Sequence, residues 1–192
     1  MVARLVHQKG LDLLATALPA VLATQNLQIA LLGSGDPALE NAFRRLAAEA
    51  PGRVGVQIGF DASLARLIQA GSDSFIMPSR SEPCGLTQLY AMRYGTPPVV
   101  RATGGLIDTV TPYDEATGSG LGFRFKEATA EALAEAIGSA CSTYHDRPAH
   151  FAALRDRGLC GDFGWGRSAA AYAQVYDWAM YARRGGDLAA SA

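Results

Sequence analysis

The segment Ser79–Gln88 (SRSEPCGLTQ) joins a predicted strand to a predicted helix around one acidic residue. The apolar run that precedes it, Phe75–Pro78, is typical of a buried parallel strand that stops at a proline. From Gly85 to Tyr94 the apolar residues recur at spacings of three and four, which predicts a helix. Glu82 therefore stands at the carboxyl end of a strand, where open α/β sheets bind their ligands.

A second turn of the same kind follows further along the chain. The predicted strand 97–101 leads into Thr103, Gly104 and Gly105, and another helix begins near Leu106. Two neighbouring turns built from small residues are expected to leave backbone N–H groups free, and such groups favour a phosphate. The sequence therefore predicts an anion site beside Glu82.

Strands and helices alternate along most of the chain. We expect strands at 2–6, 27–32, 54–58, 74–78, 97–101 and 122–125, and helices at 11–24, 38–50, 62–71, 85–94, 129–144, 148–158 and 165–183. This alternation indicates an α/β fold with a Rossmann-like parallel sheet and helices on both faces. We also expect a frayed tail at 185–192. The strand at 2–6 looks like the end of a longer one, which suggests a fragment of a larger protein.

Composition argues against several classes of function. The net charge of −1 over 192 residues indicates neither a nucleic-acid partner nor an anionic membrane surface. No apolar stretch approaches the roughly 20 residues of a membrane span, and no signal peptide is recognised. The cysteines, Cys84, Cys141 and Cys160, form no C-x-x-C pair. We expect reduced thiols in a cytoplasmic protein without a metal site.

Two cations, Arg4 and Lys9, flank the loop after the first predicted strand. They are either solvated surface charges or, because they share a strand end with Glu82, ligands of a diphosphate in one crevice. Cations in that place would stabilise the charge that develops on a departing nucleotide. Phe60 ends another strand, either as a core aromatic or stacked on a base. Cys84 is interpreted as a small buried residue beside a ligand rather than as a nucleophile.

The turn Gly33–Ala38 (GSGDPA) follows a predicted strand and fits the dinucleotide fingerprint G-x-G-x-x-G/A. That fingerprint requires an acidic residue at the end of the next strand, and Asp61 is the acid found nearby. The turn therefore binds a dinucleotide, lines another nucleotide site, or simply starts a helix with Pro37 in its first turn. Glu82 has a structural alternative as well, as an acidic cap of the helix that follows it.

Five segments, in order along the chain, resemble bacterial glycogen synthases and plant starch synthases. Arg4–Asp12 resembles their R-x-x-x-Q-K-G-x-D, and Ser79–Tyr90 resembles their S-R-F-E-P-C-G-L-T-Q-L-Y. Leu31–Asp36, Arg101–Val110 and Asp162–Trp165 are similar to L-G-x-G-D, R-x-T-G-G-L-x-D-T-V and D-x-S-W. The resemblance covers residues 2–178, and E-P-C-G-L together with T-G-G-L singles out this family among glycosyltransferases.

The resemblance implies that residues 1–184 form the C-terminal, sugar-nucleotide-binding domain of a GT-B glycosyltransferase, whose N-terminal domain is absent. The family moves glucose from ADP-glucose to the non-reducing end of an α-1,4-glucan, in glycogen synthesis, with retention of configuration and without a metal. ADP-glucose is then a substrate, and no cofactor is implied. The chain alone is expected to be inactive. The alternatives are a truncated, non-catalytic nucleotide-binding module and an NAD-binding Rossmann domain.

The resemblance also implies three catalytic residues. Arg4 and Lys9 would hold the diphosphate and assist its departure, and Glu82 would lie close to the glucosyl ring. Ser81 departs from the family, because relatives carry phenylalanine there. Tyr90 stands where many other GT-B families place a second carboxylate, which agrees with glycogen synthases.

The implied substrate-binding residues are contributed by four turns. Backbone N–H groups of Cys84 and Gly85, next to Leu86, would bind glucose hydroxyls. Phe60, a tyrosine in relatives, would stack on adenine, and Gly35 would line the nucleotide site. The diphosphate and ribose would lie along Thr103, Gly104 and Gly105.

Overall fold

The computed structural model describes residues 1–184 and has two compact units, Met1–Gly161 and a second unit that begins at Asp162. The first unit contains two parallel sheets. One pairs β1 (Ile29–Gly33) with β2 (Val54–Ile58), and the other runs in the order β3 (Phe75–Met77), β4 (Pro98–Arg101), β5 (Phe123–Phe125). The predicted α/β fold with parallel strands is confirmed. The predicted frayed tail, residues 185–192, lies outside the described residues.

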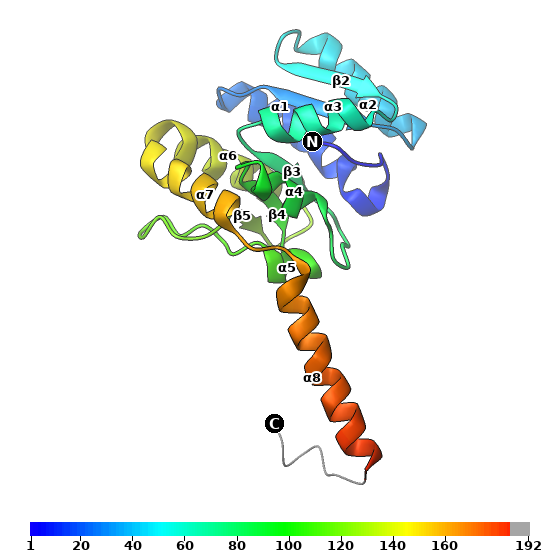
Figure 1. Cartoon of the computed structure of the whole chain (residues 1–192). Helices are drawn as coiled ribbons and strands as arrows, with labels where there is room; N and C mark the ends of the chain where they lie inside the picture. The colour runs from blue at the N-terminus through cyan, green and yellow to red at the C-terminus, as the bar shows by residue number, and fades with distance from the viewer. Residues whose placement is uncertain (185–192) are drawn as a thin grey trace. The chain divides into compact units, whose positions relative to one another are not determined.

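Helices cover both faces of the strands, as can be followed in Figure 1. Ile76 and Val99 join the hydrophobic core under α1 (Leu11–Thr24) and α6 (Ala130–Asp146), which pack against each other. Phe75 and Val100 are buried on the opposite face, because successive side chains of a strand alternate. There α4 (Thr87–Arg93) contacts β3 and β4. The other helices are η1 (His7–Lys9), α2 (Pro37–Glu49), α3 (Ala62–Gly71), α5 (Gly105–Thr109), α7 (Pro148–Cys160) and, in the second unit, α8 (Trp165–Arg183).

Side-chain caps explain where several of these helices begin. The Asp36 carboxylate accepts from Ala38 N–H at the start of α2, and the Asp61 carboxylate accepts from Ser63 and Leu64 N–H at the start of α3. Such caps satisfy backbone donors that a helix itself leaves unpaired. None of the described helices has the length and apolar character needed to cross a membrane.

The first residues of the chain lie along β1 without forming a regular strand. Ala3 N–H donates to Leu32 O at 3.1 Å, and two parallel bridges join Val2 to Leu32 and Leu5 to Gly35. The predicted strand at 2–6 is therefore reduced to two bridges. The predicted single sheet is divided between β1 and β3, because this short segment forms bridges with β1 but none with β3 in residues 1–184.

The amino group of Met1 is buried and donates to Ala30 O at 2.7 Å. Loss of hydration disfavours its charged form and lowers the pKa of this amino group from 8.0 to about 5. Between these two pH values the unfolded chain binds more protons than the folded chain. The free energy of unfolding should therefore rise with pH across this window.

We expect acetylation of the Met1 amino group to remove this contribution to the pH dependence. A pKa lowered from 8.0 to about 5 corresponds to about 4 kcal/mol across the window. Urea unfolding of the acetylated and free chains between pH 5 and pH 8 measures it. The two chains differ only at the amino group, so the difference between their curves isolates its contribution. Curves that stay parallel across the window would contradict the burial of this group.

Candidate active site

Glu82 lies just beyond the carboxyl end of β3 and forms an ion pair with Lys9. Lys9 Nζ is 2.5 Å from Glu82 Oε2, and Ser79 Oγ donates to the same oxygen at 3.3 Å. Glu82 is only 9% exposed, so a charged partner is needed to offset the loss of hydration. The structure thus brings two of the three predicted catalytic residues into contact. Glu82 is not a helix cap, because α4 begins at Thr87 with Leu86 at the N-cap position.

Arg80 ties the loop that carries Lys9 to the loop that carries Glu82. Its guanidinium donates to both carboxylate oxygens of Asp12, at 2.5 and 2.8 Å, and to His7 O at 3.1 Å. Its backbone N–H donates to Gln8 O at 2.8 Å. We define these contacts of Arg80 with Asp12, His7 and Gln8 as the Arg80 clamp. The sequence patterns did not predict the clamp, although Arg80 and Asp12 both lie in segments that resemble the synthase family.

Asp12 is held in its charged form by this clamp. Burial raises the pKa of the Asp12 carboxyl, but the hydrogen bond from Arg80 and the positive charge of its guanidinium lower it by more. The net pKa is therefore below the ordinary value of 3.8. The stability that this carboxylate contributes is present above that pH and is lost as the pH falls through the lowered value.

Glycine lets these loops approach each other closely. Gly10 adopts a φ of +67°, and a Cβ built on it would lie 2.0 Å from Pro78 O. Gly104 adopts a φ of +46°, and its Cβ would lie 2.1 Å from Glu82 O. Side chains are strained at such positive φ values, and they would also push the loops apart. The site therefore requires glycine at both positions.

The turn at Thr103, Gly104 and Gly105 packs against the Glu82 loop. Gly105 N–H donates to Glu82 O at 3.1 Å, and Thr103 N–H donates to Arg101 O at 2.9 Å. The expectation of free N–H groups is therefore wrong for Thr103 and Gly105, because contacts within the protein use them. Within residues 1–184, Gly104 N–H has no acceptor.

The side chain of Gln88 holds the turn formed by Cys84, Gly85 and Leu86. Gln88 Nε2 donates to Cys84 O at 3.1 Å and to Gly85 O at 3.0 Å. The backbone N–H groups of Cys84 and Gly85 donate to no acceptor in the described part of the chain. Cys84 is exposed, so its predicted burial is wrong. Gln88 contacts the backbone carbonyl of Cys84 and not its thiol. Leu86 is exposed as well.

The other predicted site residues lie at the ends of neighbouring strands. Arg4 is exposed, and its side chain makes no hydrogen bond or ion pair with residues 1–184. Phe60 follows β2 and is 93% exposed, which excludes the core alternative. Gly35 N–H donates to Glu40 Oε1 at 3.0 Å, so a carboxylate takes the place that a pyrophosphate would need in a dinucleotide turn. In the same described range, no three His, Cys, Asp or Glu side chains cluster as metal ligands would.

Comparison of the sequence with known proteins identifies related enzymes. Residues 1–152 match the family model described as glycosyl transferases group 1. The chain is 54% identical over 176 residues to a glycogen synthase of Anaeromyxobacter dehalogenans, and 53% identical over 175 residues to one of Halorhodospira halophila. These matches cover 92% and 91% of this chain but 36% of each relative. The chain therefore spans little more than a third of the length of these relatives.

Solved structures give the same result. The catalytic domain of starch synthase IV from Arabidopsis thaliana, bound to ADP and acarbose, superposes with a TM-score of 0.81 at 36% identity. The match covers 92% of this chain and 37% of that one. The C-terminal domain of a group 1 glycosyl transferase from Francisella tularensis matches with a TM-score of 0.64 at 15% identity, covering 82% and 80% of the two chains, which shows the fold alone. The predicted resemblance to glycogen and starch synthases is confirmed.

We expect Asp12→Asn to loosen the Arg80 clamp without unfolding the protein. The pair is partly exposed, so solvent screening limits the loss of stability to about 1 kcal/mol. The local effect should be larger: hydrogen exchange of the Arg80 amide, which donates to Gln8 O, should accelerate. The matched control is Arg44→Gln, which removes an exposed ion pair with Glu40 on α2. Equal exchange of the Arg80 amide in both variants would show that the clamp does not hold the loops.

Proposed function

The chain belongs to the glycosyl transferases of group 1, and we propose that it is the donor-binding part of an ADP-glucose-dependent glucosyltransferase. In the complete enzyme, glucose would pass from ADP-glucose to the non-reducing end of an α-1,4-glucan with retention of configuration. The observation that carries this proposal is the Lys9–Glu82 pair at the strand ends of a chain half identical to glycogen synthases. Because it spans 36% of such a relative, the chain itself would bind the nucleotide without transferring glucose.

Arg4 and Lys9 would bind the diphosphate of the donor. Arg4 is exposed and makes no hydrogen bond or ion pair within residues 1–184, so it can turn toward an anion without breaking a contact. Lys9 forms an ion pair with Glu82 and would also bind a phosphate of the donor. Two phosphates carry more negative charge than one carboxylate, so they would attract the Lys9 ammonium group more strongly. As the glycosidic bond breaks, charge accumulates on the leaving ADP. Each cation would lower the barrier by about 2–4 kcal/mol, the value of one oxyanion donor.

Glu82 would act on the sugar. A glycosyl transition state resembles an oxocarbenium ion, so a nearby carboxylate favours it over the neutral substrate. The unpaired N–H groups of Cys84 and Gly85, just before Leu86, support a role as donors to glucose hydroxyls. A glucosyl group held between these donors and Glu82 would be oriented for transfer.

The nucleotide would extend along the two remaining turns. Gly104 N–H has no acceptor within residues 1–184 and would donate to the diphosphate, beside Thr103 and Gly105. Gly35 would line the ribose side of the nucleotide. The exposed ring of Phe60 would stack on adenine, as aromatic rings do on bases.

The acceptor and the compartment belong to the same proposal. The glucan would be held by the part of the enzyme that these residues do not include. Three free cysteines fit the reducing cytoplasm, where glucose would be stored. If this chain acts alone, the same site supports a nucleotide-binding module rather than an enzyme.

We expect the chain to bind ADP, and Arg4→Ala to weaken that binding by about tenfold or more, as for a lost hydrogen bond to a charged group. Calorimetric titration with ADP measures the affinity. Arg155→Ala on α7 is the matched control, because Arg155 is also exposed and lies outside the proposed site. NADH serves as the control ligand for a dinucleotide site.

Two results would contradict the proposal. Equal losses in the Arg4 and Arg155 variants would mean that general charge, not a diphosphate site, attracts ADP. Tight NADH binding with no ADP binding would favour the dinucleotide alternative.

A further inference from the structure

Gln88 is a fully buried side chain whose amide nitrogen and amide oxygen are unequally paired. Nε2 lies 3.1 Å from Cys84 O, 3.0 Å from Gly85 O and 3.1 Å from Thr109 Oγ1. The amide oxygen, Oε1, is buried and has no hydrogen-bond donor within residues 1–184. A buried oxygen without a donor destabilises a fold, so the stability of α4 does not by itself account for a glutamine at this position.

The hydroxyl of Thr109 determines which end of the amide faces the turn. Thr109 Oγ1 donates to Gly105 O at 2.6 Å, so its single hydrogen is used and it accepts from Gln88 Nε2. If the amide were reversed, Oε1 would face three acceptors, namely Cys84 O, Gly85 O and Thr109 Oγ1. The surroundings therefore fix the orientation of the amide and direct its two N–H bonds at the turn.

Three consecutive carbonyl groups of the turn are bonded inside the protein. The glutamine amide binds Cys84 O and Gly85 O, and Pro83 O accepts from Gly105 N–H at 3.1 Å. In a trans peptide unit the carbonyl and the N–H that follows it point in opposite directions. The N–H groups of Cys84, Gly85 and Leu86 therefore point away from these partners, and none of the three has an acceptor within residues 1–184.

Gly85 lets the amide of Gln88 come this close to the backbone. The residue adopts a φ of +73°, and a Cβ built on it would lie 2.5 Å from Gln88 Oε1. A side chain at this position would push the amide away from the turn, in addition to the strain of a positive φ. The oxygen of the amide thus packs against the same short stretch of backbone that its nitrogen binds.

We propose that Gln88, oriented by Thr109, is a positioning residue for the sugar of the donor. It binds two carbonyl groups inside the protein and so directs the N–H groups of Gly85 and Leu86 outward before any ligand arrives. Hydroxyl groups of the sugar then meet hydrogen-bond donors that are already oriented, so less conformational freedom is lost on binding. Gln88 itself is buried and does not touch the ligand. This inference rests on the proposed function.

The first test measures the order of the turn in the chain without ligand. Gln88→Met keeps a side chain of similar length in the buried position but removes the amide. We expect the NMR order parameters of the Gly85 and Leu86 amides to be about 0.85 in the parent chain and to fall below about 0.6 in the variant. Order parameters that do not change would overturn the proposal, whatever the chain binds.

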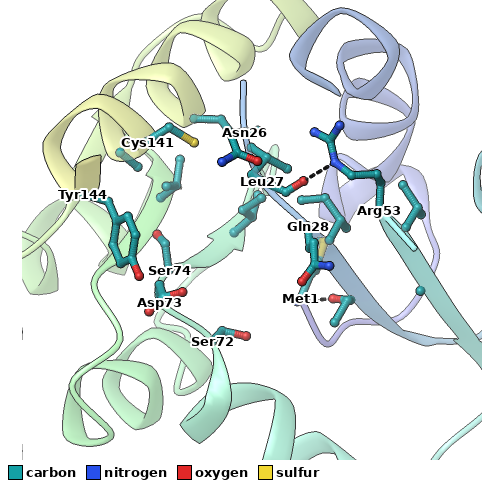
Figure 2. A pocket seen from close by; sticks show the side chains of 18 of the residues that line it. Met1, Asn26, Leu27, Gln28, Arg53, Ser72, Asp73, Ser74, Cys141 and Tyr144 are labelled. Carbon is teal, nitrogen blue, oxygen red and sulfur yellow. Dashed lines mark hydrogen bonds between the residues drawn. The ribbon is translucent and has the colours of Figure 1, made fainter. Parts of the chain in front are cut away.

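The matched control is Gln69→Met, because Gln69 is also buried but lies in the last turn of α3, at the amino ends of the strands. It stands just before Ser72, which borders a cavity of about 710 Å³ at that end; Figure 2 shows Ser72 beside Asp73 and Ser74. The control should leave the order of both amides as it is in the parent chain. Equal losses in the two variants would mean a general loosening of the fold, and the proposal would be wrong.

The second test measures the affinities of these chains for ADP and for ADP-glucose by calorimetric titration. The two ligands share the nucleotide, so the ratio of their dissociation constants isolates the sugar. We expect Gln88→Met to weaken ADP-glucose by about tenfold relative to ADP, and Gln69→Met to leave the ratio unchanged. The parent ratio in Gln88→Met would overturn the proposal. If the parent chain binds neither ligand, the proposed function fails, and the order parameters decide whether Gln88 orients the turn.

Thr109 offers a milder test that does not alter the buried glutamine. Thr109→Val removes the hydroxyl at nearly the same volume, whereas Thr109→Ser keeps it. We expect Thr109→Val alone to lower the order parameters of the Gly85 and Leu86 amides and to weaken ADP-glucose relative to ADP by about threefold. Equal behaviour of the two variants would show that the hydroxyl does not orient the amide, against the proposal.

Discussion

The contact on which the candidate site depends is the bidentate pair between Arg80 and Asp12. The pair joins residues 68 positions apart, so it holds the region of η1 and the start of α1 against the loop after β3. Lys9 and Glu82 sit on these two loops, and each is largely removed from water. Separating the loops would leave a buried carboxylate without its cation, which costs far more than the surface value of an ion pair. The clamp therefore supports the pair that the proposed chemistry uses.

The same geometry explains why small residues gather at the site. Gly10 and Gly104 bring backbone to within contact of Pro78 O and Glu82 O. The close approach of the loops also pairs backbone donors within the protein, because Gly105 N–H donates to Glu82 O. Of the N–H groups predicted to bind a ligand, those of Cys84, Gly85 and Gly104 have no acceptor within residues 1–184. A phosphate site here would rest on cations more than on a nest of amides.

Sequence patterns predicted what depends on local chemistry. The bounds of β2 and α3 agree with the expectation, since alternation defines the strand and Asp61 caps the helix. The meeting of Lys9 and Glu82 followed from the rule that parallel strands share their carboxyl edge. The Arg80 clamp, the exposure of Cys84 and the amides used by Thr103 and Gly105 did not follow. These depend on how closely loops from separate strands approach, which periodicity does not encode.

The segment Met1–Leu5 runs along β1, from its amino end beside Ala30 to its carboxyl end beside Gly35. It carries Arg4 toward the proposed diphosphate site, and its other end borders the cavity between β1 and β3. Two bridges to β1 hold it, and no strand flanks it on the β3 side within residues 1–184.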